Sequence, residues 1–144
     1  MFTWACGAHP PAGDKRTVSL TPVSCKAPGV DIFGQLIVEG KTGAVTRGVS
    51  KDESLQVTHS ESHWCTDRTF LDLVSFVEEK VDSAGGDHYI IVLDLYSVHR
   101  SELVLQATRT LHPRCHLAFI SAHTTPYAQP LDIAYRQPIK KLGK

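Results

Sequence analysis

The stretch Tyr89-Ile90-Ile91-Val92-Leu93-Asp94-Leu95-Tyr96-Ser97-Val98-His99-Arg100-Ser101 carries the clearest structural signal in the chain. Residues 89–93 form an apolar run rich in β-branched side chains, which indicates a strand buried on both faces. Asp94 ends this run, and His99 follows five positions later. Because open α/β sheets usually place their chemistry at the C-terminal ends of strands, Asp94 is a candidate functional residue. A carboxylate that merely caps a turn would explain the pattern equally well.

The composition indicates one domain with an ordinary core. Of the 144 residues, 42% are hydrophobic and 21% are charged, and we expect residues 1–144 to form a single domain. No apolar run approaches the roughly 20 residues of a membrane span, and the first residues do not resemble a secretory signal. The four cysteines include no C-x-x-C pair, which fits a reduced, intracellular protein better than a disulfide framework.

The charges are unevenly distributed, although the formal net charge is zero. Residues 100–144 contain seven basic residues and two acids, whereas residues 1–99 contain eight basic residues and thirteen acids. A basic C-terminal third is suited to contact with phosphates, but such a bias is more often an ordinary solvated surface.

The first half of the chain predicts a β-hairpin. Apolar and polar residues alternate over residues 15–25, and residues 32–38 form a second strand-like run. Pro22 has no backbone N–H, which places its part of the strand at an edge or a bulge. Residues 40–54 are polar and Gly-rich and indicate a loop, after which a short strand is allowed at residues 55–58.

Two helices are predicted, one on each side of the apolar strand. The first follows the N-cap Thr66 and ends near Val81, and the second is capped by Ser101 and stopped by Pro113. The side chains expected to face inward are Phe70, Leu73, Val74, Val77 and Val81 in the first helix and Val104, Ala107 and Leu111 in the second.

The segment after the second helix would complete a parallel pair of strands. Residues 115–120 indicate a strand, and the order strand, helix, strand implies a right-handed crossover and parallel pairing with residues 89–93. Asp132 would then emerge at the same end of the sheet as Asp94, and two converging carboxylates suit Mg²⁺ or Mn²⁺. An N-cap or first-turn acid on a last helix over residues 131–142 is the simpler explanation of Asp132.

Several motifs occur together in one order along the chain. They are residues 34–41 (GQLIVEGK), Ser62-His63-Trp64 followed by Thr69-Phe70-Leu71, Leu93-Asp94-x-x-x-x-His99-Arg100-Ser101, Thr124-Thr125-Pro126-x-x-Gln129-Pro130-Leu131-Asp132, and Lys140. Together they resemble the DDE-superfamily endonuclease domain of pogo- and Tigger-type transposases, which is also kept in centromere protein B. The resemblance runs from about Trp4 to the end of the chain.

The resemblance implies an RNase H-like fold, a mixed sheet flanked by helices. It implies metal-dependent cleavage and joining of DNA strands at transposon ends, with Mg²⁺ or Mn²⁺ as cofactor, DNA as partner and the nucleus as location; a homodimer is a further candidate. Asp94 matches the family's second catalytic acid and Asp132 the third, which would make both metal ligands. His99 matches the histidine after the second acid and would orient a phosphate or support the metal site, but a helix-entry residue with a local hydrogen bond is at least as good an explanation.

The sequence also departs from the family pattern. The family's first catalytic acid lies just before the segment matching Phe2-Thr3-Trp4, and residues 1–13 contain no acid that replaces it. In RNase H-like sheets that strand lies between the hairpin and the strand ending in Asp94, so the sheet would be incomplete, with free hydrogen-bonding edges. Leu95 stands where the family usually has Asn. We therefore expect a fragment or relic whose catalysis is impaired.

Three other functions compete with this interpretation. A transposon-derived DNA-binding or interaction module without catalysis would use the basic C-terminal third. A zinc protein has as its hints only His59-x-x-x-His63-x-Cys65 and the pair Cys115-His116, and neither is a strong zinc spacing. A cysteine hydrolase is weaker still, since no cysteine has an activating motif around it.

Overall fold

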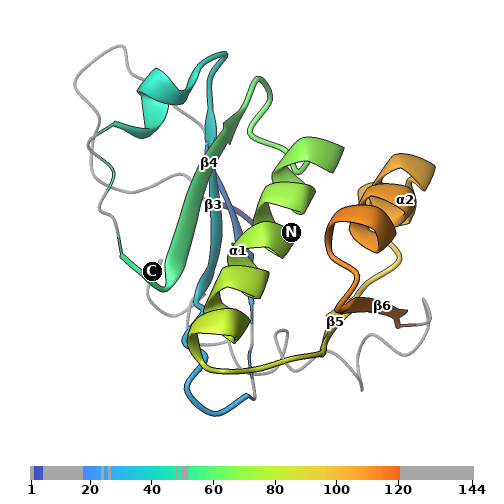
Figure 1. The fold of residues 1–144 in the computed structure, drawn as a ribbon. Coiled ribbons are helices and arrows are strands. Elements are labelled where there is room, and N and C mark those ends of the chain that lie inside the picture. Colours follow the sequence, from blue (N-terminus) through green and yellow to red (C-terminus); the bar gives the residue numbers. More distant parts are fainter. Residues whose placement is uncertain are drawn as a thin grey trace, which may run out of the picture.

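The computed structural model describes residues 2–4, 18–23, 25, 27–47, 49 and 52–120. Within these residues the chain has a mixed α/β fold (Figure 1). The elements in order are β1 (Phe2–Trp4), β2 (Val18–Pro22), β3 (Gly34–Glu39), η1 (Gly43–Thr46), β4 (Leu55–Ser60), α1 (Asp67–Ser83), β5 (Tyr89–Leu93), η2 (Val98–Arg100), α2 (Glu102–Leu111) and β6 (Cys115–Phe119).

The larger sheet is mixed and has the strand order β1-β2-β3-β4. The predicted hairpin is confirmed, because β2 pairs antiparallel with β3, and Pro22 lies at the end of β2 opposite Gly34. A Cβ at Gly34 would lie 2.4 Å from the carbonyl oxygen of Thr21, so glycine is what allows the strands to approach so closely there. The strand allowed at residues 55–58 is confirmed as β4, which is slightly longer and runs parallel to β3.

The smaller sheet consists of β5 and β6, which pair in parallel and are connected through α2. This confirms the parallel pairing predicted from the order strand, helix, strand. Among the described residues, no strand pairs with the other edge of β5, so the two sheets are not joined by hydrogen bonds. The coarse α/β class with a mixed sheet and two helices is therefore observed.

Both predicted helices are present. The Thr66 side chain accepts a hydrogen bond from the Thr69 N–H, and the Thr69 side chain accepts one from the Thr66 N–H, which forms a capping box at the start of α1. The helix ends at Ser83, two residues beyond the predicted end. The Ser101 side chain accepts a hydrogen bond from Val104 N–H at the start of α2.

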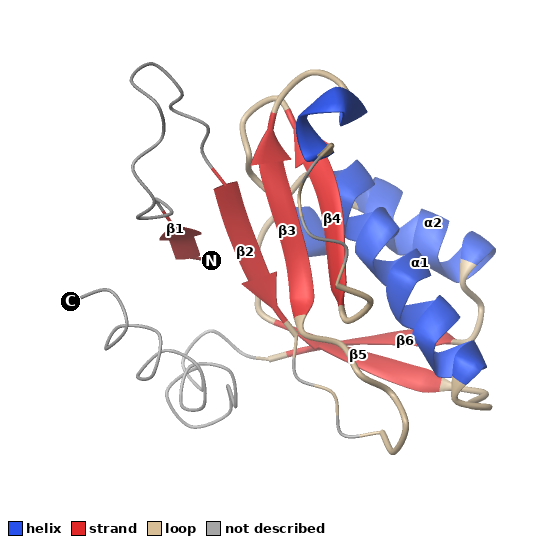
Figure 2. Ribbon diagram, turned by 90° about the vertical axis from the view of Figure 1, so that its left-hand side faces the viewer, coloured by secondary structure: helices blue, strands red, loops and turns tan. Residues whose placement is uncertain are grey.

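Helix α1 lies between β3 and β4 on one side and α2 on the other, as Figures 1 and 2 show together. Gln35 ties three elements together, because its buried amide nitrogen donates to the backbone oxygen of Thr69 and to the Gln56 side chain. The apolar core joins both sheets and both helices, and its buried members are Ile37, Cys65, Phe70, Val74, Leu93, Val104 and Cys115. This core fixes the C-terminal end of β5 against the start of α1.

Two expectations about burial were wrong. Strand β5 is not buried on both faces, because Ile90 is 66% exposed and Val92 is 59% exposed, and no described element covers that face. Leu111 does not point inward but is 65% exposed. The inward positions of α2 are spaced by four residues, so Val104 and Thr108 are followed by His112, which is only 8% exposed and takes the place expected for Leu111.

Candidate functional site

Asp94 lies where the apolar strand β5 meets solvent. The preceding residue, Leu93, is 8% exposed and belongs to the core, whereas the Asp94 side chain is 48% exposed. The Tyr96 N–H points to Asp94 Oδ1 at 3.4 Å, which is the local turn contact expected of a capping acid. The second carboxylate oxygen has no partner among the described residues, so half of the acceptor capacity of Asp94 is free.

The structure brings His99 onto Asp94. His99 lies in η2, and its Nδ1 is 3.0 Å from Asp94 Oδ1 and 3.5 Å from the Asp94 backbone oxygen. The contact that meets hydrogen-bond geometry is the one to the Asp94 backbone oxygen, and the shorter contact to Oδ1 becomes an ion pair when the imidazole is protonated. The ring packs 4.8 Å from the Phe70 ring and 5.4 Å from the Tyr96 ring, and its side chain is 13% exposed.

A second carboxylate, Asp67, lies on the same side of the core at the start of α1. Ser101 Oγ donates to Asp67 Oδ1 at 3.0 Å and accepts from Val104 N–H, so one hydroxyl links the starts of both helices. Burial raises the pKa of the Cys65 thiol, and the negative charges of Asp67 and Asp94 raise that pKa further. Both acids are therefore close enough to act on the same buried sulfur.

The arrangement fits part of a site for a hard divalent ion. The free oxygen of Asp94 is a suitable ligand for Mg²⁺ or Mn²⁺, and the His99 contact holds the carboxylate in one orientation. In the part of the chain that the structure describes, no three His, Cys, Asp or Glu side chains gather into a metal site. A complete site needs a further carboxylate from elsewhere in the sequence.

The predicted partner of Asp94 lies outside the described residues. Asp132, the motif over residues 124–132, Lys140 and the helix expected at residues 131–142 all follow residue 120, the last one described. The meeting of Asp94 and Asp132 at one end of the sheet stays a prediction.

The zinc hints in the sequence are not brought together. His63 packs on Trp64 with ring centroids 5.0 Å apart, whereas Cys65 is buried next to Thr69. Cys115 and His116 are consecutive strand residues and therefore point to opposite faces, Cys115 inward and His116 outward.

The buried cysteines are poor nucleophiles. Burial raises the pKa of the Cys115 thiol to about 11, and burial also raises the pKa of Cys65. Both thiols are protonated at neutral pH. This disfavours the cysteine hydrolase for these two residues.

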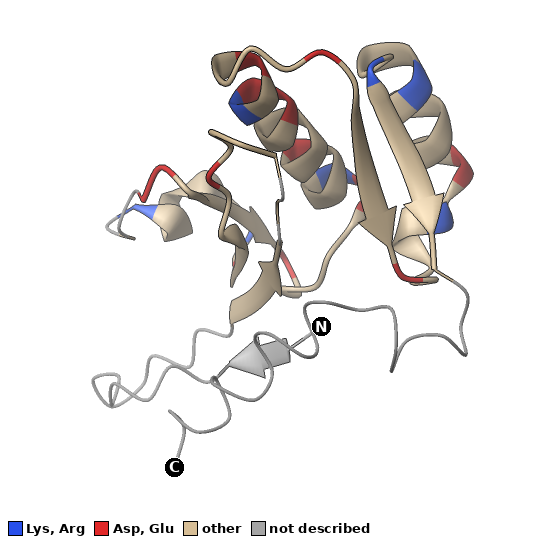
Figure 3. Ribbon diagram, turned by 90° about the horizontal axis from the view of Figure 1, so that it is seen from below, with Lys and Arg blue, Asp and Glu red and all other residues tan. Residues whose placement is uncertain are grey.

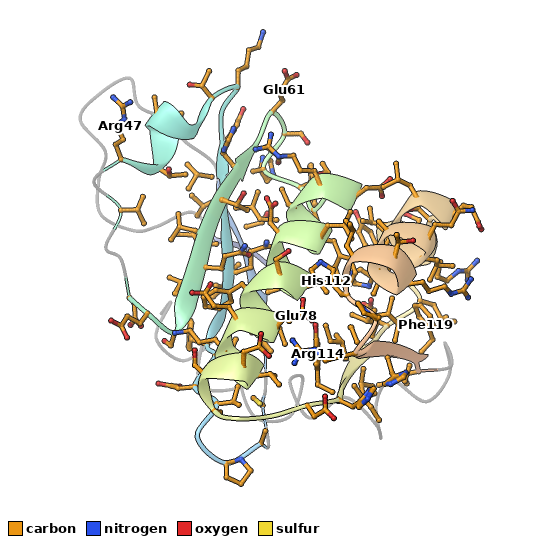
Figure 4. All side chains as sticks on the ribbon, in the orientation of Figure 1. Arg47, Glu61, Glu78, His112, Arg114 and Phe119 are labelled. Atoms are coloured by element: carbon orange, nitrogen blue, oxygen red, sulfur yellow. The ribbon has the colours of Figure 1, made fainter. Side chains whose placement is uncertain are left out.

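A second histidine–carboxylate pair, which no local pattern of the sequence predicts, lies partly buried between α1 and β6 (Figure 4). His112 Nδ1 hydrogen-bonds to Glu78 Oε2, and His112 Nε2 is 3.3 Å from Ser75 Oγ. Arg114 Nη2 is 3.1 Å from Glu78 Oε1, and Arg114 Nη1 is 2.7 Å from Asp82 Oδ1. The network ties α1 to the turn between α2 and β6.

No family model, no curated protein and no solved structure matches this chain. No helix among the described residues is long and apolar enough to cross a membrane.

Proposed function

We propose that the chain is a transposase-derived DDE endonuclease domain of RNase H-like fold, which binds DNA in the nucleus through the end of the sheet where Asp94 lies. The parent chemistry is metal-dependent cleavage and transfer of DNA strands. We further propose that cleavage is impaired, because Leu95 stands directly after Asp94 where the family usually has Asn.

The contact between Asp94 and His99 is the observation that carries this proposal. Two residues that the family motif pairs by spacing lie 3.0 Å apart at the C-terminal end of a parallel strand. That end is where open α/β folds usually bind their ligands. The parallel order β5, α2, β6 further supports the RNase H-like arrangement.

Each residue has a definite task in this scheme. Asp94 would hold a divalent ion through its free oxygen together with Asp132, and the ion would supply charge stabilisation and an activated water when bound. We assign His99 as a positioning residue, because its Nδ1 lies 3.0 Å from the Asp94 carboxylate and its ring packs on Phe70.

One basic side chain near the site is suited to a phosphate-bearing partner. Figure 3 shows that α1 and α2 both carry acidic and basic segments, so this residue and not a basic surface supports such a partner. Arg100 follows His99 directly, is exposed, and forms no ion pair with any described residue. An exposed guanidinium that directly follows His99 in sequence is suited to a DNA phosphate.

Metal binding at Asp94 is tested by titrating Mn²⁺ into ¹⁵N-labelled protein and following paramagnetic broadening of amide signals. We expect selective broadening around residues 94–99, which disappears in Asp94→Asn. Glu61→Gln, which removes an exposed acid elsewhere, should leave the broadening unchanged. Equal broadening in Asp94→Asn would show that Asp94 does not bind the metal.

DNA binding and cleavage are tested together. Fluorescence anisotropy with a labelled duplex should show affinity that falls steeply with salt, and Arg100→Ala should weaken it while lowering the salt slope by about one. Arg47→Ala, on the far side of the molecule in Figure 4, is the control. Nicking of supercoiled plasmid in Mg²⁺ or Mn²⁺ should be weak, and strong nicking abolished by Asp94→Ala would refute the impairment.

A DNA-binding or interaction module without catalysis is the second candidate. Asp94 keeps one carboxylate oxygen without a partner among the described residues, which favours the nuclease over the module. The exposed side chain of Arg100 fits either function. Salt-dependent DNA binding with no Mn²⁺ effect at Asp94 would favour the module. Absence of DNA binding would contradict the nuclease origin and a DNA-binding module, and would leave only an interaction module.

A further inference from the structure

His88 and His116 come together at the opposite end of β5 from Asp94. His88 directly precedes β5, and His116 is the second residue of β6. Because Tyr89 pairs with Cys115, the strand register places the two histidines diagonally across the parallel pair. Their rings are stacked at 23°, with centroids 5.4 Å apart, and both side chains are exposed.

The two ring nitrogens have the spacing of a metal chelate. His88 Nδ1 is 3.2 Å from His116 Nε2. Two imidazole nitrogens bound to one tetrahedral zinc ion, each at about 2.0–2.1 Å, are roughly 3.3 Å apart. The observed separation is close to this spacing, although the two nitrogens here share a hydrogen bond. A bound ion would replace the proton between them, and that proton would move to the other nitrogen of its ring.

Asp87 completes the outer part of the arrangement. Its Oδ2 is 3.9 Å from His88 Nε2, the nitrogen that carries the proton when Nδ1 binds a metal. A carboxylate behind a ligating imidazole fixes the tautomer and makes the nitrogen a better ligand. Asp87 is at ion-pair distance from His88 and not at hydrogen-bond distance, so its negative charge favours a proton on Nε2 and leaves Nδ1 as the ligand.

We propose that His88 and His116 form a binding site for a divalent transition metal ion of the zinc class, supported by Asp87. The two imidazoles are neutral in the complex, so each binds through one nitrogen and keeps a proton on the other. Among the described residues no third protein ligand is present, so water completes the coordination and the ion exchanges with solvent. Imidazole ligands separate this site from the all-oxygen site expected at Asp94.

Zinc is the probe for the test. Isothermal titration of the full chain should show one equivalent of Zn²⁺ bound, with binding that survives excess Mg²⁺. His88→Ala and His116→Ala should each weaken the affinity at least tenfold. Asp87→Asn should weaken it by up to about tenfold, the lower range for groups that orient a ligand.

Matched variants make the result specific. His59→Ala removes a partly buried histidine of β4, and Asp94→Asn removes the acid at the other end of β5; both should retain zinc. Two-dimensional ¹H–¹⁵N spectra of the rings should show zinc shifting Nδ1 of His88 and Nε2 of His116. Unchanged affinity in His88→Ala, or equal loss in His59→Ala, would overturn the proposal without touching the function proposed for Asp94.

Discussion

Two histidine–carboxylate pairs in this chain differ in how fully their hydrogen-bonding groups are used. In the closed pair, His112 and Glu78, both ring nitrogens and both carboxylate oxygens have protein partners. In the open pair, His99 and Asp94, one carboxylate oxygen has no partner among the described residues. The closed pair joins residues 34 apart in sequence, and the open pair joins residues five apart.

The difference separates a structural role from a functional one. In the closed pair each carboxylate oxygen already has a protein partner, and the two side chains are only 10% and 18% exposed, so the pair holds elements together. The open pair exposes 48% of its carboxylate and needs little long-range packing to form. Asp94 is therefore the better candidate for a functional residue, although Glu78 and His112 form the better buried pair.

Breaking the closed pair should have the largest effect on stability. His112→Ala removes one hydrogen-bond partner of the largely buried Glu78 carboxylate, which is then less well compensated for its lost hydration. We expect the free energy of unfolding to fall by about 2–3 kcal/mol. Urea unfolding at neutral pH, followed by circular dichroism, measures it. His88→Ala, an exposed histidine that packs on no core residue, should change stability by no more than about 0.5 kcal/mol in zinc-free buffer. An unchanged midpoint for His112→Ala would show that the network is not stabilising.

Breaking the open pair should cost far less. Asp94→Asn removes the charge from a half-exposed contact with His99, and exposed charged pairs contribute about 0–1 kcal/mol even when both groups are ionised. His99→Ala should cost more than Asp94→Asn, because it also removes the ring that packs on Phe70. The same urea experiment decides both. A loss for Asp94→Asn as large as that for His112→Ala would mean that Asp94 is structural.

Local signals predicted much of the fold. The N-cap Thr66 and the apolar spacing after it give the start and the inner face of α1, and the run over residues 89–93 gives β5. The contact of His99 with Asp94 also follows from local sequence, since five residues in a tight turn bring the two side chains together. The same contact is compatible with a helix-entry residue, so His99 alone does not establish function.

Tertiary packing explains what the sequence did not reveal. The contacts of Glu78 with His112 and Arg114 cross 34 and 36 residues, and no local periodicity encodes them. The meeting of His88 with His116 depends on the register of two strands. Likewise, an apolar run does not say how many of its faces another layer covers, which is why Ile90 was expected inside.

The smallest expected effect is a pH dependence at the edge of the closed pair. Hydrogen bonding from Arg114 holds the pKa of Asp82 below its ordinary value. Between that lowered pKa and the ordinary value near 4, the unfolded chain binds more protons than the folded chain. The contact of Asp82 with Arg114 therefore adds to the free energy of unfolding at neutral pH, and this contribution is lost as the pH falls through the folded pKa. Asp82→Asn should therefore flatten the decline of unfolding free energy below about pH 4, measured by urea titrations at several pH values.

The flattening should be partial. Hydrogen bonds from Ser54 also lower the pKa of Asp52, whose contribution has the same sign and stays in the variant. Glu79→Gln, on the same helix but without an ion-pair partner among the described residues, should keep the slope of the original chain. If Asp82→Asn and Glu79→Gln show the same slope of unfolding free energy against pH, the contact between Arg114 and Asp82 is too weak in solution to affect stability. The closed network would then end at Glu78.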